Sequence, residues 1–311
     1  MKARSSLVAR RGDFRAVVLY NRRIGARNYR IALRLPAEAV AAFVGFQPGQ
    51  FLEVNLSQTA LPPTEAVPAD LADKTDRQIL LRRPFSLSDL ANESGGLVAE
   101  LTYCVVGPAT LRMTTLREGD SLQVLGPLGH GFDVPDGLRW AILVAGGMGA
   151  PPIQHLASIL TRDHPSIKPI GFAGAKTADA LPFETSPSDP RSPCLSALGL
   201  EWHVATDDGS WGRRGFVTQC LQTWLASHPH QDRGATGIYA CGPEPMLAKV
   251  AQIAQAHGIA CQVSMERRMA CGFGVCQGCA VQCRSDDAAG PYRLCCQDGP
   301  VFNAKEVVFE A

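Results

Sequence analysis

Short apolar runs separated by turn signals occupy the first 132 residues of the chain. The runs cover residues 14–19, 29–33, 50–54 and 97–103, with Gly-containing turn stretches at 47–49, 94–96 and 117–120. Short strands with regular turns are typical of an antiparallel barrel or sandwich. Residues 57–77 interrupt this rhythm with Pro, Ala, Thr and Asp, and they predict a surface insertion between two strands.

The pattern changes after Leu138, where apolar strands begin to alternate with helical segments. Strands are predicted at 141–145, 169–173, 202–205 and 237–240, and helices are predicted to begin at about residues 152, 216 and 245. Strands that alternate with helices indicate a parallel α/β sheet. Residues 182–195 are rich in Pro and Ser and predict a loop. The C-terminal segment has no long periodic stretch, so we expect it to fold around whatever its cysteines bind.

Composition narrows the classes of function. A chain of 311 residues with 46% hydrophobic residues has room for two ordinary domains and a small third one. The formal net charge of +1 gives no electrostatic reason to expect a nucleic acid or an anionic membrane as partner. No apolar run approaches the roughly 20 residues of a membrane-spanning helix. The basic N-terminus faintly resembles a transit peptide but lacks an apolar signal region, so we expect a cytoplasmic location.

The cysteines are the compositional anomaly, because six of the 11 lie between residues 271 and 296. Cys271, Cys276 and Cys279 have the C-x4-C-x2-C spacing of plant-type [2Fe–2S] proteins. The glycines between them let the backbone approach a cluster and offer N–H groups to its sulfurs. A structural zinc site or unligated buried thiols are the alternatives, but zinc usually takes two C-x2-C pairs. Cys295 or Cys296 is favoured as the fourth ligand, because the cysteine at 283 lies too close to the first loop.

A candidate flavin-binding strand ends in Arg83-Pro84-Phe85-Ser86. An Arg side chain can pair with a flavin phosphate, and a Ser hydroxyl can reach the flavin N5 atom. Taken alone, the same residues could form an edge strand with surface arginines. Gly107 and Thr110 lie in a further loop near the domain boundary, which could also be a plain turn.

Three loops are predicted at the carboxyl edge of the parallel sheet, where open α/β sheets bind ligands. They contain Gly146, Gly147 and Gly149 in the first, Asp208 and Gly209 in the second, and Cys241, Gly242 and Pro243 in the third. The first and third follow a strand and open a helix, whose N-terminus can face a pyrophosphate. One such loop is ordinary in α/β proteins, whereas three at one edge indicate a nucleotide site. Cys241 is either a nicotinamide contact or a buried core thiol.

Taken in order, these motifs resemble the ferredoxin–NADP reductase superfamily, and within it the electron-transfer subunits of NAD-linked dihydroorotate dehydrogenase. The resemblance rests on R-P-F-S, A-G-G-x-G-x-x-P, C-G-P-x-x-M and the cysteine motif, and it covers about 12–56, 79–180 and 198–303. It implies a multi-domain α/β plus β fold. An antiparallel β-barrel domain for FAD would span 12–135, a parallel α/β domain for NAD 136–259, and a small [2Fe–2S] domain 260–311.

The resemblance also implies roles for single residues. Residues 83–86 would lie at the flavin and Thr110 near its phosphates, while Ser86 and Cys241 would act at the reacting rings. Cys296 would be the fourth cluster ligand, because the family's cysteine directly precedes x-D-G-P-V-F, as Cys296 does here. Ala109 departs from the family's G-x-G-T loop, in which a glycine stands at this position.

By this likeness the chain would relay electrons from the FMN of a catalytic dihydroorotate dehydrogenase subunit, through [2Fe–2S] and FAD, to NAD⁺ in pyrimidine biosynthesis. A TIM barrel alone takes about 250 residues, so the chain is expected to be the relay in a heterotetramer with that subunit. The alternatives are a stand-alone NAD(P)H reductase that feeds an oxygenase, and a structural or sensory subunit without turnover. NADP stays open, since Lys176, Arg213 and Arg214 could read a 2′-phosphate.

Overall fold

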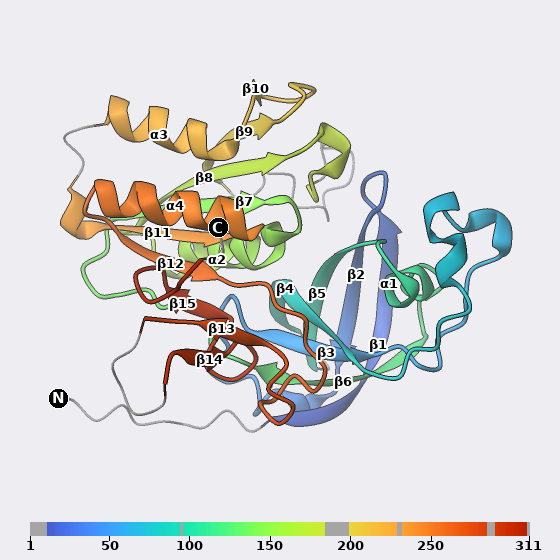
Figure 1. Cartoon of the computed structure of the whole chain (residues 1–311). Coiled ribbons are helices and arrows are strands. Elements are labelled where there is room, and N and C mark those ends of the chain that lie inside the picture. The colour runs from blue at the N-terminus through green and yellow to red at the C-terminus, as the bar shows by residue number, and fades with distance from the viewer. Residues whose placement is uncertain (1–10, 94–95, 184–198, 229–231, 285–289, 310–311) are drawn as a thin grey trace.

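The computed structural model describes residues 11–93, 96–183, 199–228, 232–284 and 290–309. Figure 1 shows a β-barrel on the right and a sheet with helices on the upper left. The C-terminal segment, coloured red, lies below the sheet and reaches the barrel. The loop predicted at 182–195 falls almost entirely outside the described residues.

The barrel is closed, and all its strands pair antiparallel. Around the barrel the strands are β1 (Gly12–Arg23), β2 (Asn28–Leu35), β5 (Gly96–Cys104), β4 (Arg83–Glu93), β3 (Phe51–Asn55) and β6 (Ser121–Leu128). Its interior is filled by apolar side chains such as Ile31, Leu33 and Leu35, which point inward from alternate positions of β2. The short helix α1 (Pro108–Met113) adds Leu111 and Met113 to the same core.

Residues 57–77 lie at the barrel surface and contain two 3-10 helices, η2 (Thr64–Ala66) and η3 (Ala69–Lys74). Leu71 is the buried residue of η3 and packs into the barrel core. A salt bridge between Arg27 and Asp70, 2.8 Å from Nη1 to Oδ2, ties the same helix to the barrel. Elsewhere the described chain has four further 3-10 helices, η1 (Ala37–Ala39), η4 (Gly147–Gly149), η5 (Ala178–Ala180) and η7 (Arg233–Ala235).

The second body is a seven-stranded sheet that is parallel except at one edge. Its order is β10 (Arg213–Arg214), β9 (Glu201–Thr206), β8 (Lys168–Ala175), β7 (Trp140–Gly146), β11 (Thr236–Cys241), β12 (Ala260–Ser264) and β15 (Val301–Asn303). The three α-helices that flank it are α2 (Ala150–Asp163), α3 (Val217–Ser227) and α4 (Glu244–Ala256). Alternate residues of β7 pack on opposite layers, with Ile142 facing α3 and α4 and Leu143 facing α2.

The C-terminal segment is joined to both bodies. It forms a hairpin of β13 (Ala280–Gln282) and β14 (Tyr292–Leu294), and then returns to the sheet as β15, which pairs antiparallel with β12. Strand β12 lies before the cysteine loop and β15 after it, so the sheet contains strands from the segment that the sequence assigns to a third domain. The boundary at 260 therefore stays a prediction, and the structure places β12 beside β11 in one sheet.

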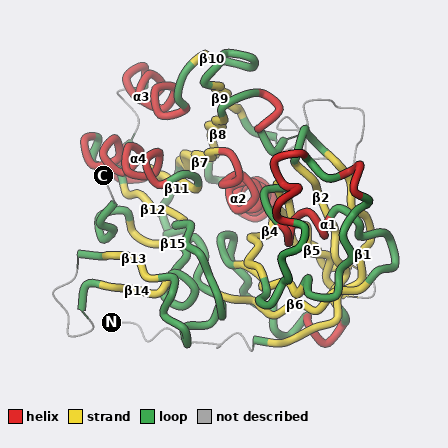
Figure 2. The backbone as a smooth tube through the Cα atoms, turned by 45° about the vertical axis from the view of Figure 1, so that its right-hand side comes forward, coloured by secondary structure: helices red, strands yellow, loops and turns green. Residues whose placement is uncertain are grey.

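Barrel and sheet meet along α2, which packs on β4 and β7 and lies between the two bodies in Figure 2. His155 of α2 is 2% exposed, and its ring stacks on Phe46 with the centroids 5.6 Å apart. On the other side, the His130 backbone N–H donates to the Gly299 carbonyl at 2.6 Å, which joins the barrel to the C-terminal segment. Within the described residues, no helix is both long and apolar enough to cross a membrane.

Candidate functional site

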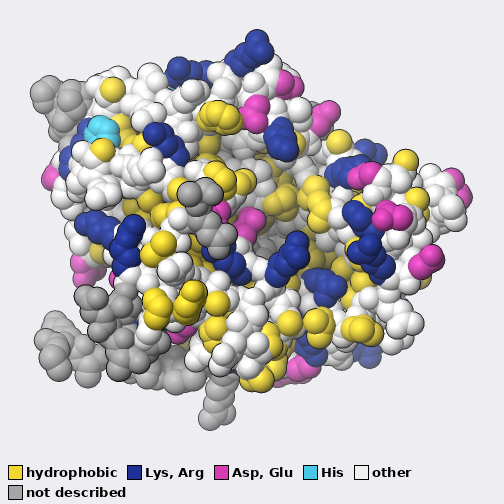
Figure 3. Space-filling view, in the orientation of Figure 1, with side chains coloured by type: hydrophobic (Ala, Val, Ile, Leu, Met, Phe, Trp, Pro, Cys, Tyr) yellow, Lys and Arg dark blue, Asp and Glu magenta, His cyan; other side chains and the backbone are white. Residues whose placement is uncertain are grey.

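A cavity of about 450 Å³ opens where the barrel, the sheet and the C-terminal segment meet. Figure 3 shows this hollow near the centre of the face, with apolar side chains inside and Lys and Arg side chains around the rim. Phe51, Phe85 and Thr110 line it from the barrel, Met148 and Cys241 from the sheet. Its size and its apolar lining suit a flat aromatic cofactor such as a flavin.

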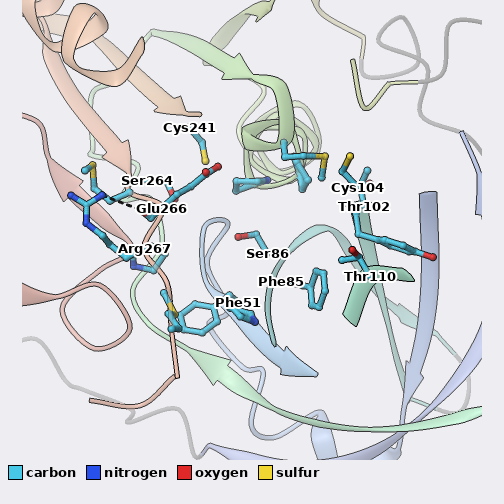
Figure 4. A pocket seen from close by; sticks show the side chains of 18 of the residues that line it. Phe51, Phe85, Ser86, Thr102, Cys104, Thr110, Cys241, Ser264, Glu266 and Arg267 are labelled. Atoms are coloured by element: carbon cyan, nitrogen blue, oxygen red, sulfur yellow. Dashed lines mark hydrogen bonds between the residues drawn. The ribbon is translucent and has the colours of Figure 1, made fainter. Parts of the chain in front are cut away.

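Several predicted flavin residues meet at this cavity, while others lie beside it. Pro84, Phe85, Ser86 and Thr110 line it, and Figure 4 shows the Ser86 hydroxyl pointing into the open space. Arg83 is not among the lining residues, and its Nη1 donates to the carbonyl oxygens of the residues at 81 and 82, at 2.7 and 3.0 Å. The guanidinium would therefore have to turn to reach a phosphate.

The side chain of Thr110, rather than the backbone freedom of Gly107, stabilises the loop before α1. The Thr110 hydroxyl oxygen accepts hydrogen bonds from the backbone N–H groups of Val106 and Gly107, at 3.0 and 3.2 Å. A Cβ atom added at Gly107 would meet no atom within 4 Å, so this position does not require glycine for space. Ala109, which stands at the second glycine of the family pattern, is 5% exposed and packs into the barrel core.

Cys241 and Glu266 face the cavity together, and only the cysteine was predicted from the sequence. Figure 4 shows the Glu266 carboxylate beside the Cys241 thiol, opposite Ser86. Burial raises the pKa of Cys241 to about 12, and the nearby Glu266 charge adds to that shift. Burial also raises the pKa of Glu266. Both groups are thus held toward their neutral forms, and the signal for Glu266 was its place two residues after a buried strand.

A second cavity of about 660 Å³ lies at the carboxyl ends of β7, β8 and β11. Gly146, Gly147 and Pro243 line it as predicted, whereas Gly149 and Gly242 serve close packing. A Cβ atom at Gly149 would lie 2.1 Å from the Cys241 carbonyl oxygen, and one at Gly242 would lie 2.9 Å from Gly146 Cα. The two glycines therefore let the first and third loops touch.

In the acidic loop after β9, Asp207 and not the predicted Asp208 lines the second cavity. The Asp208 carboxylate instead accepts hydrogen bonds from the Ser210 backbone N–H and hydroxyl, at 3.0 and 2.6 Å, while Gly209 makes the turn with φ +78°. Lys176 lines the cavity as well, together with Lys249, which belongs to no motif of the sequence. Arg213 and Arg214 are exposed outside it.

The four predicted cluster cysteines are close in two pairs. Cys279 Sγ and Cys296 Sγ are 3.2 Å apart, and the Cys276 backbone N–H donates to Cys271 Sγ at 3.4 Å. In the described part of the chain, no group of three or more His, Cys, Asp or Glu residues could hold a single metal ion. A [2Fe–2S] cluster takes two protein ligands at each iron, so two pairs suit it better than they suit zinc.

Backbone amides surround the cysteine loop and favour thiolate sulfur. Burial raises the pKa of the Cys271 thiol, but hydrogen bonds led by the backbone N–H groups of Cys276, Phe273 and Val275 outweigh burial and lower it to about 6. Gly272 and Gly274 turn the chain with φ of +76° and +92°. Such convergent N–H groups are what the sulfurs of an iron–sulfur cluster require, so the loop fits the cofactor.

Cys295, which directly precedes the predicted ligand Cys296, points away from the cysteine loop. Its thiol donates to the Met265 carbonyl oxygen at 3.3 Å and is wholly buried, whereas Cys296 faces Cys279. Adjacent residues of an extended or turning chain point in different directions, which separates the two members of the doublet.

Comparison with known proteins agrees with this site. A family model described as the iron–sulfur cluster binding domain of dihydroorotate dehydrogenase B matches residues 266–308. The chain is 33% identical over 299 residues to the electron transfer subunit of dihydroorotate dehydrogenase B (NAD⁺) from Caldanaerobacter subterraneus, covering 96% of this chain and 100% of that one. It is 35% identical over 302 residues to the subunit of the same name from Bacillus caldolyticus, covering 96% and 99%.

Solved structures support the fold. A structure of an NADH-dependent reduced ferredoxin–NADP oxidoreductase has a TM-score of 0.70 at 23% identity, covering 94% of this chain and 90% of that one. The ferredoxin reductase of carbazole 1,9a-dioxygenase has a TM-score of 0.56 at 19% identity, covering 80% and 67%. The predicted combination of an antiparallel barrel, a parallel α/β sheet and a C-terminal iron–sulfur segment is confirmed. The full-length relatives show that the chain belongs to the family of dihydroorotate dehydrogenase B electron transfer subunits.

Proposed function

We propose that this chain relays electrons from the FMN of a catalytic dihydroorotate dehydrogenase subunit to NAD⁺ in pyrimidine biosynthesis, using [2Fe–2S] and FAD. The observation that carries the proposal is the pairing of the four cysteines within the segment that matches the dihydroorotate dehydrogenase B cluster domain. The same segment supplies Glu266 and Met269 to the wall of the flavin cavity, so cluster and flavin sites share one stretch of chain.

One cavity would hold the flavin and the other the nicotinamide nucleotide. FAD, when bound, supplies the chemistry that links two-electron transfer with a nicotinamide to one-electron transfer with an iron–sulfur cluster. Phe51 and Phe85 would hold its ring system, and Ser86 would offer a hydroxyl to the reacting edge. Cys241, which is 4% exposed, would exclude water from the place where the nicotinamide ring arrives, with the Glu266 carboxylate beside it.

The nucleotide would enter through the second cavity. Gly146, Gly147 and Pro243 form the wall against which a pyrophosphate would lie, and Asp207 lies where an adenosine ribose would be read. Cys241 belongs to the same loop as Pro243 but lines the flavin cavity. A dinucleotide lying along this loop would therefore reach from one cavity to the other.

Cys271, Cys276, Cys279 and Cys296 would hold the cluster, with Cys295 left as a core thiol. The partner would be the FMN-containing catalytic subunit, and a heterotetramer with two copies of each chain in the cytoplasm is the assembly we propose. The cysteine loop carries exposed apolar side chains at Phe273 and Val275, which offer that partner a surface next to the cluster.

The test is to purify the tagged protein from its native host, with whatever binds it, and to assay dihydroorotate-dependent NAD⁺ reduction without oxygen. We expect activity together with a second, FMN-bearing chain, and light scattering should give the mass of a heterotetramer. Flavin and cluster absorbance that NADH bleaches, without any activity on dihydroorotate, would reject the pyrimidine role. The co-purified chain would then identify the acceptor of a general NAD(P)H reductase.

A further inference from the structure

Glu53 is a buried carboxyl group that the proposed function does not use. It lies in the middle of β3, where its register partners on the two neighbouring strands are Pro84 of β4 and Leu125 of β6. Its exposed fraction is 0%, and neither carboxylate oxygen has a hydrogen-bond partner among the described residues. Burying a carboxyl group without a partner costs several kcal/mol or neutralises it, so its presence calls for a physical explanation.

The side chain of Glu53 is aimed at the cysteine loop. A Cβ atom added at Gly272 would lie 2.5 Å from Glu53 Oε1 and 2.6 Å from Glu53 Cγ. Gly272 directly follows Cys271 and has a φ of +76°. The absence of a side chain at this position is therefore what allows the carboxyl group to reach the loop backbone.

Glu53 also stands between two redox sites. It shares a face of β3 with Phe51, which lies two positions away and lines the flavin cavity. Glu53 itself is not among the residues that line that cavity. Its charge would therefore act more strongly on the cysteine loop, which it touches, than on the flavin.

The nearest cations are engaged elsewhere. Arg82 forms a salt bridge with Asp13, 2.6 Å from Nη2 to Oδ2, and Arg83 donates to backbone carbonyls. Burial raises the pKa of Glu53 to about 7, although Arg83 and Arg82 oppose that shift. Neither guanidinium makes an ion pair with Glu53 in the described structure, so the carboxylate charge is not neutralised by a contact.

We propose that Glu53 sets the reduction potential of the [2Fe–2S] cluster relative to that of the flavin. This inference rests on the proposed function, since it requires a cluster in the cysteine loop. A negative charge in a dry interior disfavours the arrival of another electron nearby, and it does so with little screening. Glu53 would thus lower the potential of the cluster and make it a better electron donor to the flavin, which is the direction that leads to NAD⁺.

The test compares the holoprotein with the Glu53→Gln variant, which keeps the shape of the side chain and removes its charge. Both are titrated anaerobically at pH 8.5, with the cluster followed by electron paramagnetic resonance and the flavin by absorbance. We expect the cluster potential to rise by the equivalent of a tenfold change in equilibrium constant, about 59 mV for one electron, and the flavin potential to rise less. Glu53→Asp, which keeps the charge, should stay near wild type, as should the exposed control Glu118→Gln.

An unchanged cluster potential in a fully loaded Glu53→Gln protein would overturn the proposal. Loss of the cluster from Glu53→Gln, with iron content retained in Glu53→Asp, would also overturn it, because Glu53 would then hold the loop rather than set the potential. Wild-type protein that carries no cluster after anaerobic purification or reconstitution would reject the proposed function itself. Iron content therefore separates the failure of this inference from the failure of the function on which it rests.

Discussion

At the scale of single residues, the doublet Cys295-Cys296 shows how two identical side chains acquire different surroundings. Cys296 lies 3.2 Å from the Cys279 sulfur, and Cys295 donates to the Met265 carbonyl. We predict that Cys296→Ser loses most of the cluster, because one of the four thiolates is removed from its pair. Cys295→Ser is the matched control and should keep the cluster, with at most a modest loss of stability. Iron and sulfide content and the cluster absorbance measure both results, and equal losses in the two variants would contradict the assignment.

Single functional residues were harder to predict from the sequence than the helices and strands. The spacing of Cys271, Cys276 and Cys279 predicts a cluster because three thiolates at fixed short intervals leave few other chemical uses. Glu53 gave no comparable signal, since a carboxylate within a strand pattern predicts a solvent-facing residue, and Glu266 had only its place two residues after a buried strand. Only the packing of β3 against the cysteine loop buries Glu53, and only the meeting of the barrel with the chain after β12 brings Glu266 to the flavin cavity.

At the scale of elements, the end of β9 decides which acidic residue faces the nucleotide. Asp207 lines the cavity near Lys176, and Asp208 turns to Ser210. We predict that Asp207→Ala narrows the preference for NADH over NADPH by about tenfold in kcat/KM, or roughly 1.4 kcal/mol. The reason is that the carboxylate repels a 2′-phosphate, and its removal leaves the lysines of the cavity to attract one.

Asp208→Ala is the control for that prediction, because it removes the same charge one residue away and outside the cavity. It should leave the preference for NADH close to that of the unaltered protein. Steady-state rates with the two nucleotides and an artificial acceptor give the comparison. A larger change in Asp208→Ala than in Asp207→Ala would show that the loop moves when the nucleotide binds.

Helix α2 carries a pH-sensitive residue at the junction of barrel and sheet. Burial, assisted by Arg162, lowers the pKa of His155 to about 3 from its ordinary value of 6.5. Below about pH 6.5, His155 is protonated in the unfolded chain but stays neutral in the folded one. The free energy of unfolding therefore falls as the pH drops. We predict that the wild type loses about 1.4 kcal/mol more than His155→Phe between pH 7.5 and 5.5.

Phenylalanine keeps the aromatic stack on Phe46 and cannot be protonated, which makes it the informative replacement. Denaturant unfolding at the two pH values measures the difference, with a substitution of the partly exposed His257, His257→Gln, as the control that should retain the full loss. The buried carboxyl group of Glu53 is present in both proteins, so its contribution to the pH dependence cancels in the comparison. Identical pH dependence in wild type and His155→Phe would mean that His155 gains access to water in solution.

The elements themselves were largely predictable from the sequence. Short apolar runs predicted β1, β2, β3 and β5, and the candidate flavin-binding strand predicted β4, whereas no predicted run covered β6. The later strand–helix rhythm predicted β7, β8, β9 and β11 with their helices. Those patterns depend on local burial, which a short window of sequence records. Strand β15 was not predicted, because three residues at Val301–Asn303 carry no period, and their pairing with β12 joins parts of the chain far apart in sequence.

At the scale of the whole molecule, the cysteine loop has an exposed apolar surface of its own. Phe273 is 41% exposed and Val275 is 74% exposed, on the loop where the cluster would lie close to solvent. We predict that Val275→Asp weakens binding of the catalytic subunit by at least tenfold, because a charge there must be desolvated when the partner covers it. Val44→Asp is the control, since Val44 is 60% exposed and belongs to the connection between β2 and β3 rather than to this loop.

Size-exclusion chromatography and calorimetric titration of the two subunits measure this effect. Cluster content and the bleaching of flavin by NADH should be unchanged in both variants, which separates docking from folding. If Val275→Asp binds the catalytic subunit as tightly as Val44→Asp does, the partner covers another face of the molecule.

The antiparallel strand β15 has a consequence for the order in which the protein is built. A ribosome delivers β12 first, then the whole cysteine loop, and only then the strand that closes the edge of the sheet. Until that last strand emerges, β12 presents an open edge that other chains can pair with. Pairing of β15 with β12 fixes both ends of the cysteine loop at the same time. Nascent chains that are released before residue 303 should therefore be the ones most prone to aggregate.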